Sequence, residues 1–190
     1  MKKTLMLAVG MMMIVAAQAQ NSIEESIEQH KETKVEQFLK TCSFTKTEYV
    51  YEVKQDNFVM QPLIITDLVT GNKIAGVRCS YDNTNGALGY YDFEEIDDVL
   101  RVLDEILLLS KQDRQYQQTY ILWKSTSGVE IYYDAKENET FFRKAWKYVN
   151  QYGVLSTYYQ STDDTNIYAV GKIRQDLARA KTILEDLMAQ

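Results

Sequence analysis

The sequence has little histidine, proline and cysteine: 190 residues include one His, one Pro and two Cys. A single His excludes zinc sites built from several His ligands. It leaves His30 as the one candidate for a histidine-based triad, and no G-x-S-x-G segment accompanies it, so we interpret His30 as a structural residue. Basic residues are also scarce, with 21 Lys and Arg against 27 Asp and Glu. The net charge of −6 excludes a generic nucleic-acid binder, because phosphate binding needs a basic patch.

The N-terminus has the pattern of an export signal. Lys2 and Lys3 precede an apolar run over 5–16, and Ala17-Gln18-Ala19 has the small-x-small pattern that signal peptidase recognises. We therefore predict a cleaved signal peptide over 1–19 and an exported protein, periplasmic or secreted. An uncleaved anchor is the alternative, and no later segment predicts a transmembrane helix. Cleavage would change the net charge from −6 to −8, because it removes two lysines and no acidic residue.

Both cysteines lie after this signal. In an oxidising compartment an even number of cysteines favours one disulfide, so we predict a bond between Cys42 and Cys79. Two buried free thiols are the alternative.

The rest of the chain predicts an α+β fold: antiparallel sheets with helices packed on one face. Composition is typical of a globular domain, with 45% apolar residues and no linker rich in Pro, Gly or Ser. We predict an amphipathic helix within 20–42, from Ser22 to Thr41, and a single domain over 43–190. Strands are expected at 48–54, 58–69, 73–81 and 87–91, with an edge or a bulge at Pro62.

The second part of the chain repeats this order. Strands are expected at 119–124, 129–133, 154–159 and 166–170, and 140–149 fits a strand better than a helix. Helices are expected from Asp92 to Ser110 and over 171–189. Because each part contains several strands followed by a helix, we suspect two duplicated halves, 43–111 and 116–190.

The segment from Tyr90 to Asp97, YYDFEEID, carries a resemblance. It is similar to a family of small exported proteins, chiefly from Bacteroidota, in which an aromatic strand leads into D-[FY]-x-E-I and an apolar helix. The resemblance covers about 45–190 and implies the fold and export. It implies no activity and no catalytic residues.

Two acidic clusters have a simple explanation in local structure. Glu94, Glu95, Asp97 and Asp98 lie in the first turns of a predicted helix, where acids complement the helix dipole. The segment 163–166 is typical of a solvated turn. Both could bind a cation, but no Ca²⁺ loop pattern is present, so we predict no metal site and no cofactor.

Tyrosine is the one unusual feature, with 14 residues. Many lie in adjacent pairs on predicted strands, where one ring of each pair must face outward. Exposed Tyr and Trp residues are frequent in interfaces and on sugar-binding platforms. The candidate binding residues are Tyr49, Tyr51, Trp123, Tyr132, Trp146 and Tyr158.

These observations favour a non-enzymatic exported module that binds a protein or peptide partner through a sheet face rich in Tyr and Trp. A glycan-binding module using the same rings is the second hypothesis. A small hydrolase with an Asp/Glu site is the third, and it requires a carboxyl group with a raised pKa.

Overall fold

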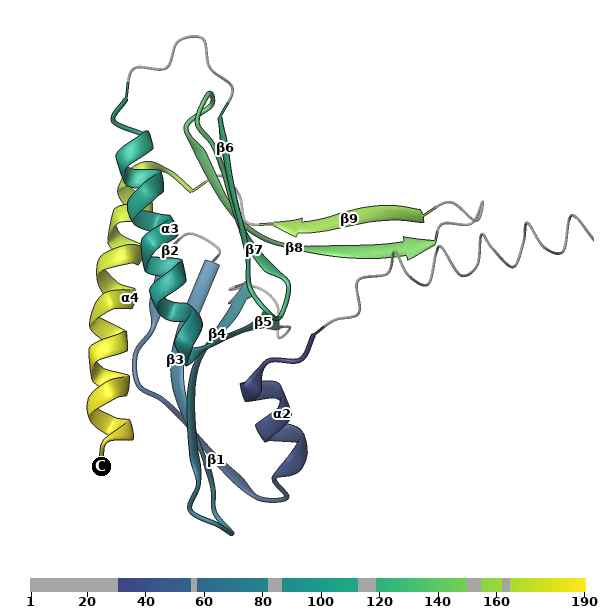
Figure 1. Cartoon of the computed structure of the whole chain (residues 1–190), viewed down its shortest axis with the longest axis vertical. Helices are drawn as coiled ribbons and strands as arrows, with labels where there is room; N and C mark the ends of the chain where they lie inside the picture. The colour runs from purple at the N-terminus through teal and green to yellow at the C-terminus, as the bar shows by residue number, and fades with distance from the viewer. Residues whose placement is uncertain (1–30, 56–57, 82–86, 113–118, 150–154, 162–164) are drawn as a thin grey trace, which may run out of the picture. The chain divides into compact units, whose positions relative to one another are not determined.

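The computed structural model describes residues 31–55, 58–81, 87–112, 119–149, 155–161 and 165–190 (Figure 1). The chain divides into two compact units, one of Met1–Gln29 with Lys147–Tyr158 and one of His30–Trp146 with Tyr159–Gln190. In the first unit only the backbone of 147–149 and 155–158 is described. The predicted signal peptide over 1–19 lies outside the described residues. All the described side chains belong to the second unit.

Sheet A contains the strands β1 (Thr45–Tyr49), β2 (Val53–Gln55), β3 (Phe58–Asp67), β4 (Lys73–Tyr81) and β5 (Ala87–Asp92). Its order is β1-β3-β4-β5, with β2 also paired to β3, and the described pairings are antiparallel. The third and fourth expected strands match β4 and β5 closely. The first does not, because β1 ends at Tyr49 and β2 begins only at Val53.

Pro62 explains this break. Within β3, Pro62 pairs with Val77 of β4, so the strand is continuous on that side. On the other side Tyr49 faces Leu63 and Val53 faces Met60, so the partner chain is interrupted opposite Pro62. Proline has no N–H for the ladder, and its carbonyl oxygen accepts one bond from Val50 N, at 3.0 Å. The irregularity predicted at Pro62 therefore lies in the neighbouring chain segment, between β1 and β2, and β3 itself is a central strand.

Sheet B contains β6 (Tyr120–Lys124), β7 (Val129–Asp134), β8 (Glu139–Val149) and β9 (Leu155–Ser161), in that order. The segment 140–149 is a strand, as expected. The predicted strand over 166–170 is wrong: the last helix, α4, spans Ile167–Met188. Asn166 is its N-cap and accepts a bond from Ala169 N at 3.0 Å, so a local capping signal outweighs the β-branched residues after it.

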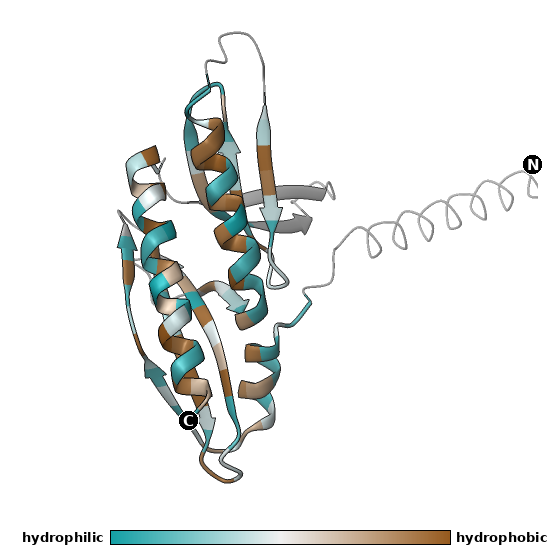
Figure 2. Ribbon diagram, turned by 60° about the vertical axis from the view of Figure 1, so that its left-hand side comes forward, coloured by the Kyte–Doolittle hydropathy of each residue, from teal (hydrophilic) through white to brown (hydrophobic). Residues whose placement is uncertain are grey.

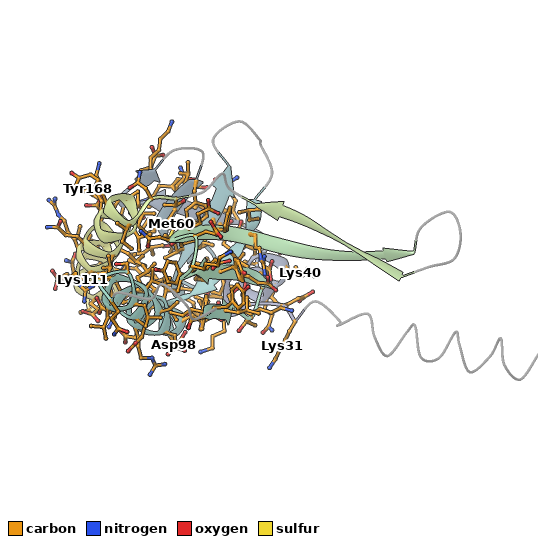
Figure 3. All side chains as sticks on the ribbon, turned by 90° about the horizontal axis from the view of Figure 1, so that it is seen from above. Lys31, Lys40, Met60, Asp98, Lys111 and Tyr168 are labelled. Carbon is orange, nitrogen blue, oxygen red and sulfur yellow. The ribbon has the colours of Figure 1, made fainter. Side chains whose placement is uncertain are left out.

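Helices α3 (Ile96–Leu109) and α4 share one side of the core, and Figure 2 shows apolar residues recurring along both. The core joins the two helices to both sheets. It includes Met60, which lies inside the packed side chains in Figure 3, whereas Tyr168 of α4 points away from them and is 80% exposed. Both parts of the chain thus place antiparallel strands before one helix, which supports an α+β fold. The buried residues that α3 and α4 contribute to this core are Ile96, Val99, Leu103, Ile106, Val170, Ile173, Leu177 and Leu184.

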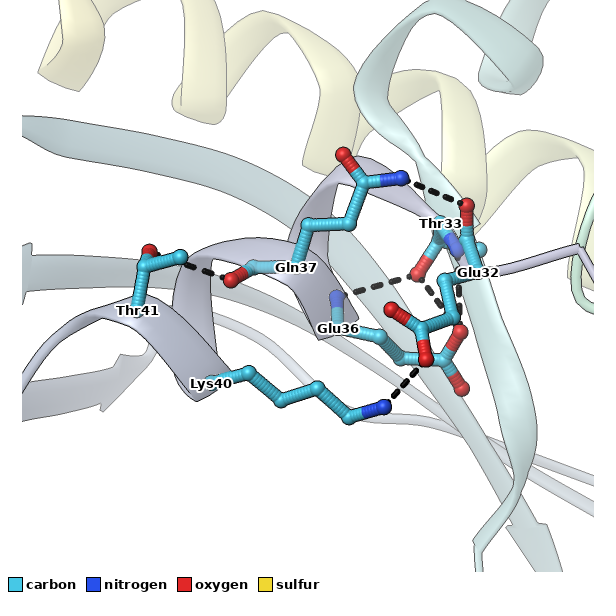
Figure 4. Close-up of polar contacts among 6 residues, drawn as sticks. All are labelled: Glu32, Thr33, Glu36, Gln37, Lys40 and Thr41. Carbon is cyan, nitrogen blue, oxygen red and sulfur yellow. Dashed lines mark hydrogen bonds and ion pairs between the residues drawn. The ribbon is translucent and has the colours of Figure 1, made fainter.

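Helix α2 (Lys34–Thr41) covers the opposite face of sheet A, where Val35 packs with Leu63 and Ile65. The expected helix began at Ser22, but 31–33 are not helical and 22–30 lie outside the described residues. Thr33 is the N-cap: its hydroxyl accepts from Glu36 N at 3.1 Å, and Glu36 accepts from Thr33 N at 2.9 Å (Figure 4). This T-x-x-E capping box starts the helix eleven residues after the expected N-cap.

The resemblance segment YYDFEEID forms a structural junction. Asp92, buried at the end of β5, accepts from Lys34 N at 2.9 Å and from Val35 N at 3.2 Å, so its carboxylate caps α2. Its own N–H donates to Glu95 at 2.8 Å, which forms a capping box before α3, across the 3-10 turn η1 (Phe93–Glu95). Glu95 also accepts from Thr126 N at 2.6 Å in the β6–β7 turn. Four elements therefore meet at two carboxylates.

Candidate functional site

The outer face of sheet B, turned away from the core, carries exposed and half-buried aromatic and apolar side chains on three neighbouring strands. The register places its side chains in three rows across β6, β7 and β8. We call these residues the outer face of sheet B. The rows are Tyr120–Asp134–Glu139, Leu122–Tyr132–Phe141 and Lys124–Glu130–Arg143.

Two exposed side chains of this face lie on β6, the outer strand of the sheet. Tyr120 is 46% exposed and Leu122 is 60% exposed. The strand alternates, so Ile121 and Trp123 turn inward and pack against the core. The exposed side chains of β6 therefore alternate with the inward-facing ones, and the exposed ones all lie on one face of the sheet.

Tyr132 lies at the centre of this face. Its ring stacks with Tyr120 at 5.7 Å and lies 6.2 Å from the ring of Phe141. The guanidinium of Arg143 lies over the same ring, 4.3 Å from its centroid. Partial burial raises the pKa of the Tyr132 hydroxyl above its usual 10.0, and the nearby Asp134 carboxylate raises it further. The hydroxyl is therefore neutral at physiological pH and remains a hydrogen-bond donor.

Arg143 is held in place by Glu130. Its Nε donates to Glu130 Oε2 at 3.0 Å, with the two side chains only 19% and 9% exposed. An ion pair shielded from water in this way is hard to rearrange, because breaking it would leave a buried charge. The guanidinium therefore keeps its position over the Tyr132 ring.

The candidate residues from the sequence do not share this face. Tyr49 is 54% exposed on sheet A, on the side of α2, because it pairs with Leu63. Tyr51 lies in the break between β1 and β2 and packs toward α4, with its hydroxyl 3.5 Å from Asp176. The strand expected over 48–54 would place Tyr49 and Tyr51 on one face. They lie apart, because β1 ends at Tyr49 and β2 begins only at Val53, after the interruption opposite Pro62.

The other candidates, the two tryptophans and Tyr158, are not shown on this face either. Trp123 faces the core, with its ring edge-on to Tyr91 at 5.6 Å and 72°. The prediction that Trp123 is an exposed binding residue is therefore wrong. Trp146 of β8 and Tyr158 of β9 have side chains outside the described residues. Only Tyr132 of the six candidates is shown on the outer face of sheet B.

The predicted bond between Cys42 and Cys79 is not formed in the structure, where both residues are free thiols. Cys79 faces the main core. Cys42 lies beside Asp67, at the far end of β3, where hydrogen bonds from Thr70, from Val69 N and from the Cys42 thiol lower the pKa of the Asp67 carboxyl. Cys79 pairs with Met60, seven residues from Asp67 along β3, or about 23 Å at the usual rise per residue. A disulfide needs Cα atoms within about 7 Å, so this fold holds the two thiols apart.

The acidic groups form a different pattern from that of an acid–base site. The pKa values of Asp67, Glu94 and Asp104 are all lowered, first by hydrogen bonds from Thr70, Lys34 and Arg174 respectively. This direction is opposite to the one that the hydrolase hypothesis requires. In the described part of the chain no cluster of His, Cys, Asp and Glu could hold a metal ion, and no helix is long and apolar enough to cross a membrane.

Sequence reasoning missed Tyr120, Leu122, Phe141 and Arg143. The signal was present in the sequence, because the short connection between the strands expected at 119–124 and 129–133 fixes which of their residues face each other. Ser125 N donates to Val129 O at 2.9 Å, and from this pair the register places Leu122 opposite Tyr132. Counting outward from the turn would have found the middle row.

Comparison with family models, with curated proteins and with solved structures gave no match. The function is therefore inferred from the geometry of the chain itself.

Proposed function

We propose that this chain is an exported interaction module that binds a protein or peptide partner through the outer face of sheet B. The row Leu122–Tyr132–Phe141 carries the proposal, because it presents apolar and aromatic surface on rigid strands. Tyr and Arg residues with constrained side chains contribute most of the binding energy in many interfaces. Here Tyr132 and Arg143 are already positioned by each other and by Glu130.

A protein partner suits this face better than a glycan. The rings of sugar platforms present a flat, open surface. The register places Tyr120 and Arg143 toward opposite ends of the Tyr132 ring, and both pack against it. What Tyr132 presents is its edge and its neutral hydroxyl, which suit an irregular protein surface.

The test is affinity capture. The protein recovered after export of the full-length chain would be immobilised and exposed to envelope and secreted fractions of a bacterium that carries the gene. We expect one stoichiometric protein, identified by mass spectrometry, and capture reduced at least about tenfold by Phe141→Ala or Tyr120→Ala.

Tyr168→Ala is the matched control, since Tyr168 is equally aromatic and 80% exposed but lies on α4. Equal loss of capture with Tyr168→Ala and Tyr120→Ala would contradict the assignment to this face. So would a partner retained by both outer-face variants and lost with Val69→Ser, at the other exposed apolar group, which contains Phe44, Leu68 and Val69.

A further inference from the structure

Strand β6 lies at one edge of sheet B, as the first strand in the order β6-β7-β8-β9. Ser125 N donates to Val129 O, and Ala135 N donates to Thr119 O, both at 2.9 Å. In an antiparallel pair the bonded residues alternate, so the odd-numbered residues of β6 bond to β7. The backbone groups of Tyr120, Leu122 and Lys124 therefore point away from β7, toward the open edge.

The same three residues carry the side chains of β6 that lie on the outer face of sheet B. Edge strands with exposed apolar residues pair readily with another strand, and natural proteins usually shield them. In the described part of the chain no strand pairs with this edge. Leu122, 60% exposed, lies at its centre.

We propose that β6 pairs antiparallel with β6 of a second copy of this chain, across a two-fold axis at Leu122. A two-fold interface brings the same surface from both copies together. Leu122 then faces its own counterpart, and Tyr120 faces Lys124 of the second copy. The two sheets become one continuous sheet.

The charges of the rows fit this symmetry. On β7 and β8 the row that begins at Tyr120 continues with Asp134 and Glu139, and it is acidic. Across the axis it meets the row of Lys124, Glu130 and Arg143, which has a net positive charge. The middle row meets itself, so Leu122, Tyr132 and Phe141 of each copy form one apolar strip. In both of these row pairings, no like charges lie directly opposite each other, a placement that would destabilise the dimer.

On the inner side of β6 the pairing is also favourable. Ile121 of one copy faces Trp123 of the other, and both are partly buried apolar side chains packed against the core. The axis thus joins apolar to apolar surface on both faces of the strand.

Sedimentation equilibrium of the exported protein is the first test, and it should show a concentration-dependent dimer. Leu122→Lys and Leu122→Glu each place like charges on the axis, so the dissociation constant of the dimer should rise about tenfold or more. An equimolar mixture of the two variants should restore dimers, because lysine then faces glutamate. Leu108→Lys on α3, where Leu108 is 54% exposed, is the matched control and should leave the dimer unchanged.

A cross-linking test fixes the register without depending on those charges. In a Cys42→Ser background, Leu122→Cys should form a covalent dimer on oxidation, because facing Cα atoms lie about 5.5 Å apart. Tyr120→Cys alone should not, whereas a mixture of Tyr120→Cys and Lys124→Cys should. A monomer at all concentrations, or a dimer that Leu122→Lys does not weaken, would overturn the proposal. Partner capture is read separately through Phe141, which lies two strands from the axis.

Discussion

At the scale of single residues, the Asp92 carboxylate connects two helices that are far apart in the sequence. Its side chain caps α2 by accepting from Lys34 N and Val35 N, and its own N–H donates to Glu95 at the start of the next helix. The group is 7% exposed, so water cannot replace these bonds without local opening.

Asp92→Ala should therefore lower the free energy of unfolding by about 1–2 kcal/mol, the usual cost of losing an N-cap. Urea unfolding followed by circular dichroism measures the change. Asp186→Ala, at an exposed site on α4, is the control and should stay within about 0.5 kcal/mol of the native protein. Equal midpoints for the two variants would contradict the role of Asp92.

The two thiols should react differently. Cys79 is fully buried and burial raises the pKa of its thiol far above 9.0, whereas Cys42 is partly exposed. Titration with a thiol reagent should find one reactive thiol in the native protein and two in denaturant. No reactive thiol in denaturant would mean that the two cysteines are bonded, and this fold would then be wrong around them.

At the scale of elements, α3 and α4 are joined at their polar edge as well as in the core. Arg174 binds Asp104 through two bonds, Nε–Oδ1 at 2.8 Å and Nη2–Oδ2 at 2.9 Å. Lys181 bonds to both carboxylate oxygens of Asp97, at 2.8 and 2.9 Å. These pairs fix the register of one helix against the other.

The Asp104–Arg174 pair should give a pH-dependent contribution. The Arg174 guanidinium lowers the pKa of Asp104 below its usual 3.8, so the folded state holds this proton less tightly than the unfolded state. The contribution is complete above pH 3.8 and is lost as the pH falls through the lowered value. Because both side chains are partly exposed, Asp104→Asn should cost only about 0.5 kcal/mol at pH 7.

Urea unfolding of the native protein and of Asp104→Asn at several pH values measures this difference. It should decrease as the pH falls below 3.8, and it should also decrease in 1 M salt. A difference that stays constant as the pH is lowered would mean that the pair does not stabilise the fold.

Elements set by neighbouring residues could be predicted, and those set by distant residues could not. The hairpin strands β4 and β5 and helix α3 follow from local turns, alternation and caps. The start of α2 is marked by the local capping box of Thr33 and Glu36, but its second cap, Asp92, lies 58 residues from Lys34 along the chain, and no local pattern announces that bond. Trp123 illustrates the same limit, because only the register of sheet B decides which face of β6 meets the core.

At the scale of the whole molecule, one core connects the two sheets. Phe58 of β3 stacks on Phe142 of β8 at 4.2 Å and 14°, and both rings are at most 1% exposed. At the other contact, a Cβ on Gly89 of β5 would come within 2.6 Å of Ser127 Oγ, so only glycine permits this approach of β5 to the β6–β7 turn. The described part of the second unit should therefore unfold as one body.

Phe142→Ala tests this unity. It should lower the free energy of unfolding by about 3–5 kcal/mol, since a buried aromatic ring leaves a cavity, and unfolding should remain a single transition. Phe141→Ala, at the neighbouring residue on the outer face, should cost under about 1 kcal/mol. Two separate transitions in calorimetry would show that the sheets fold independently.

The long-range cap of α2 also has a consequence for the order in which the chain acquires structure. A helix of eight residues is too short to persist alone in water, even with its Thr33 capping box, and α2 gains its buried partners and its second cap from β3, β4 and Asp92. During synthesis Lys34–Thr41 emerges first, and we expect it to become a stable helix only after β5 has emerged as well. The position of one carboxylate, 58 residues from Lys34, therefore sets when this helix can form.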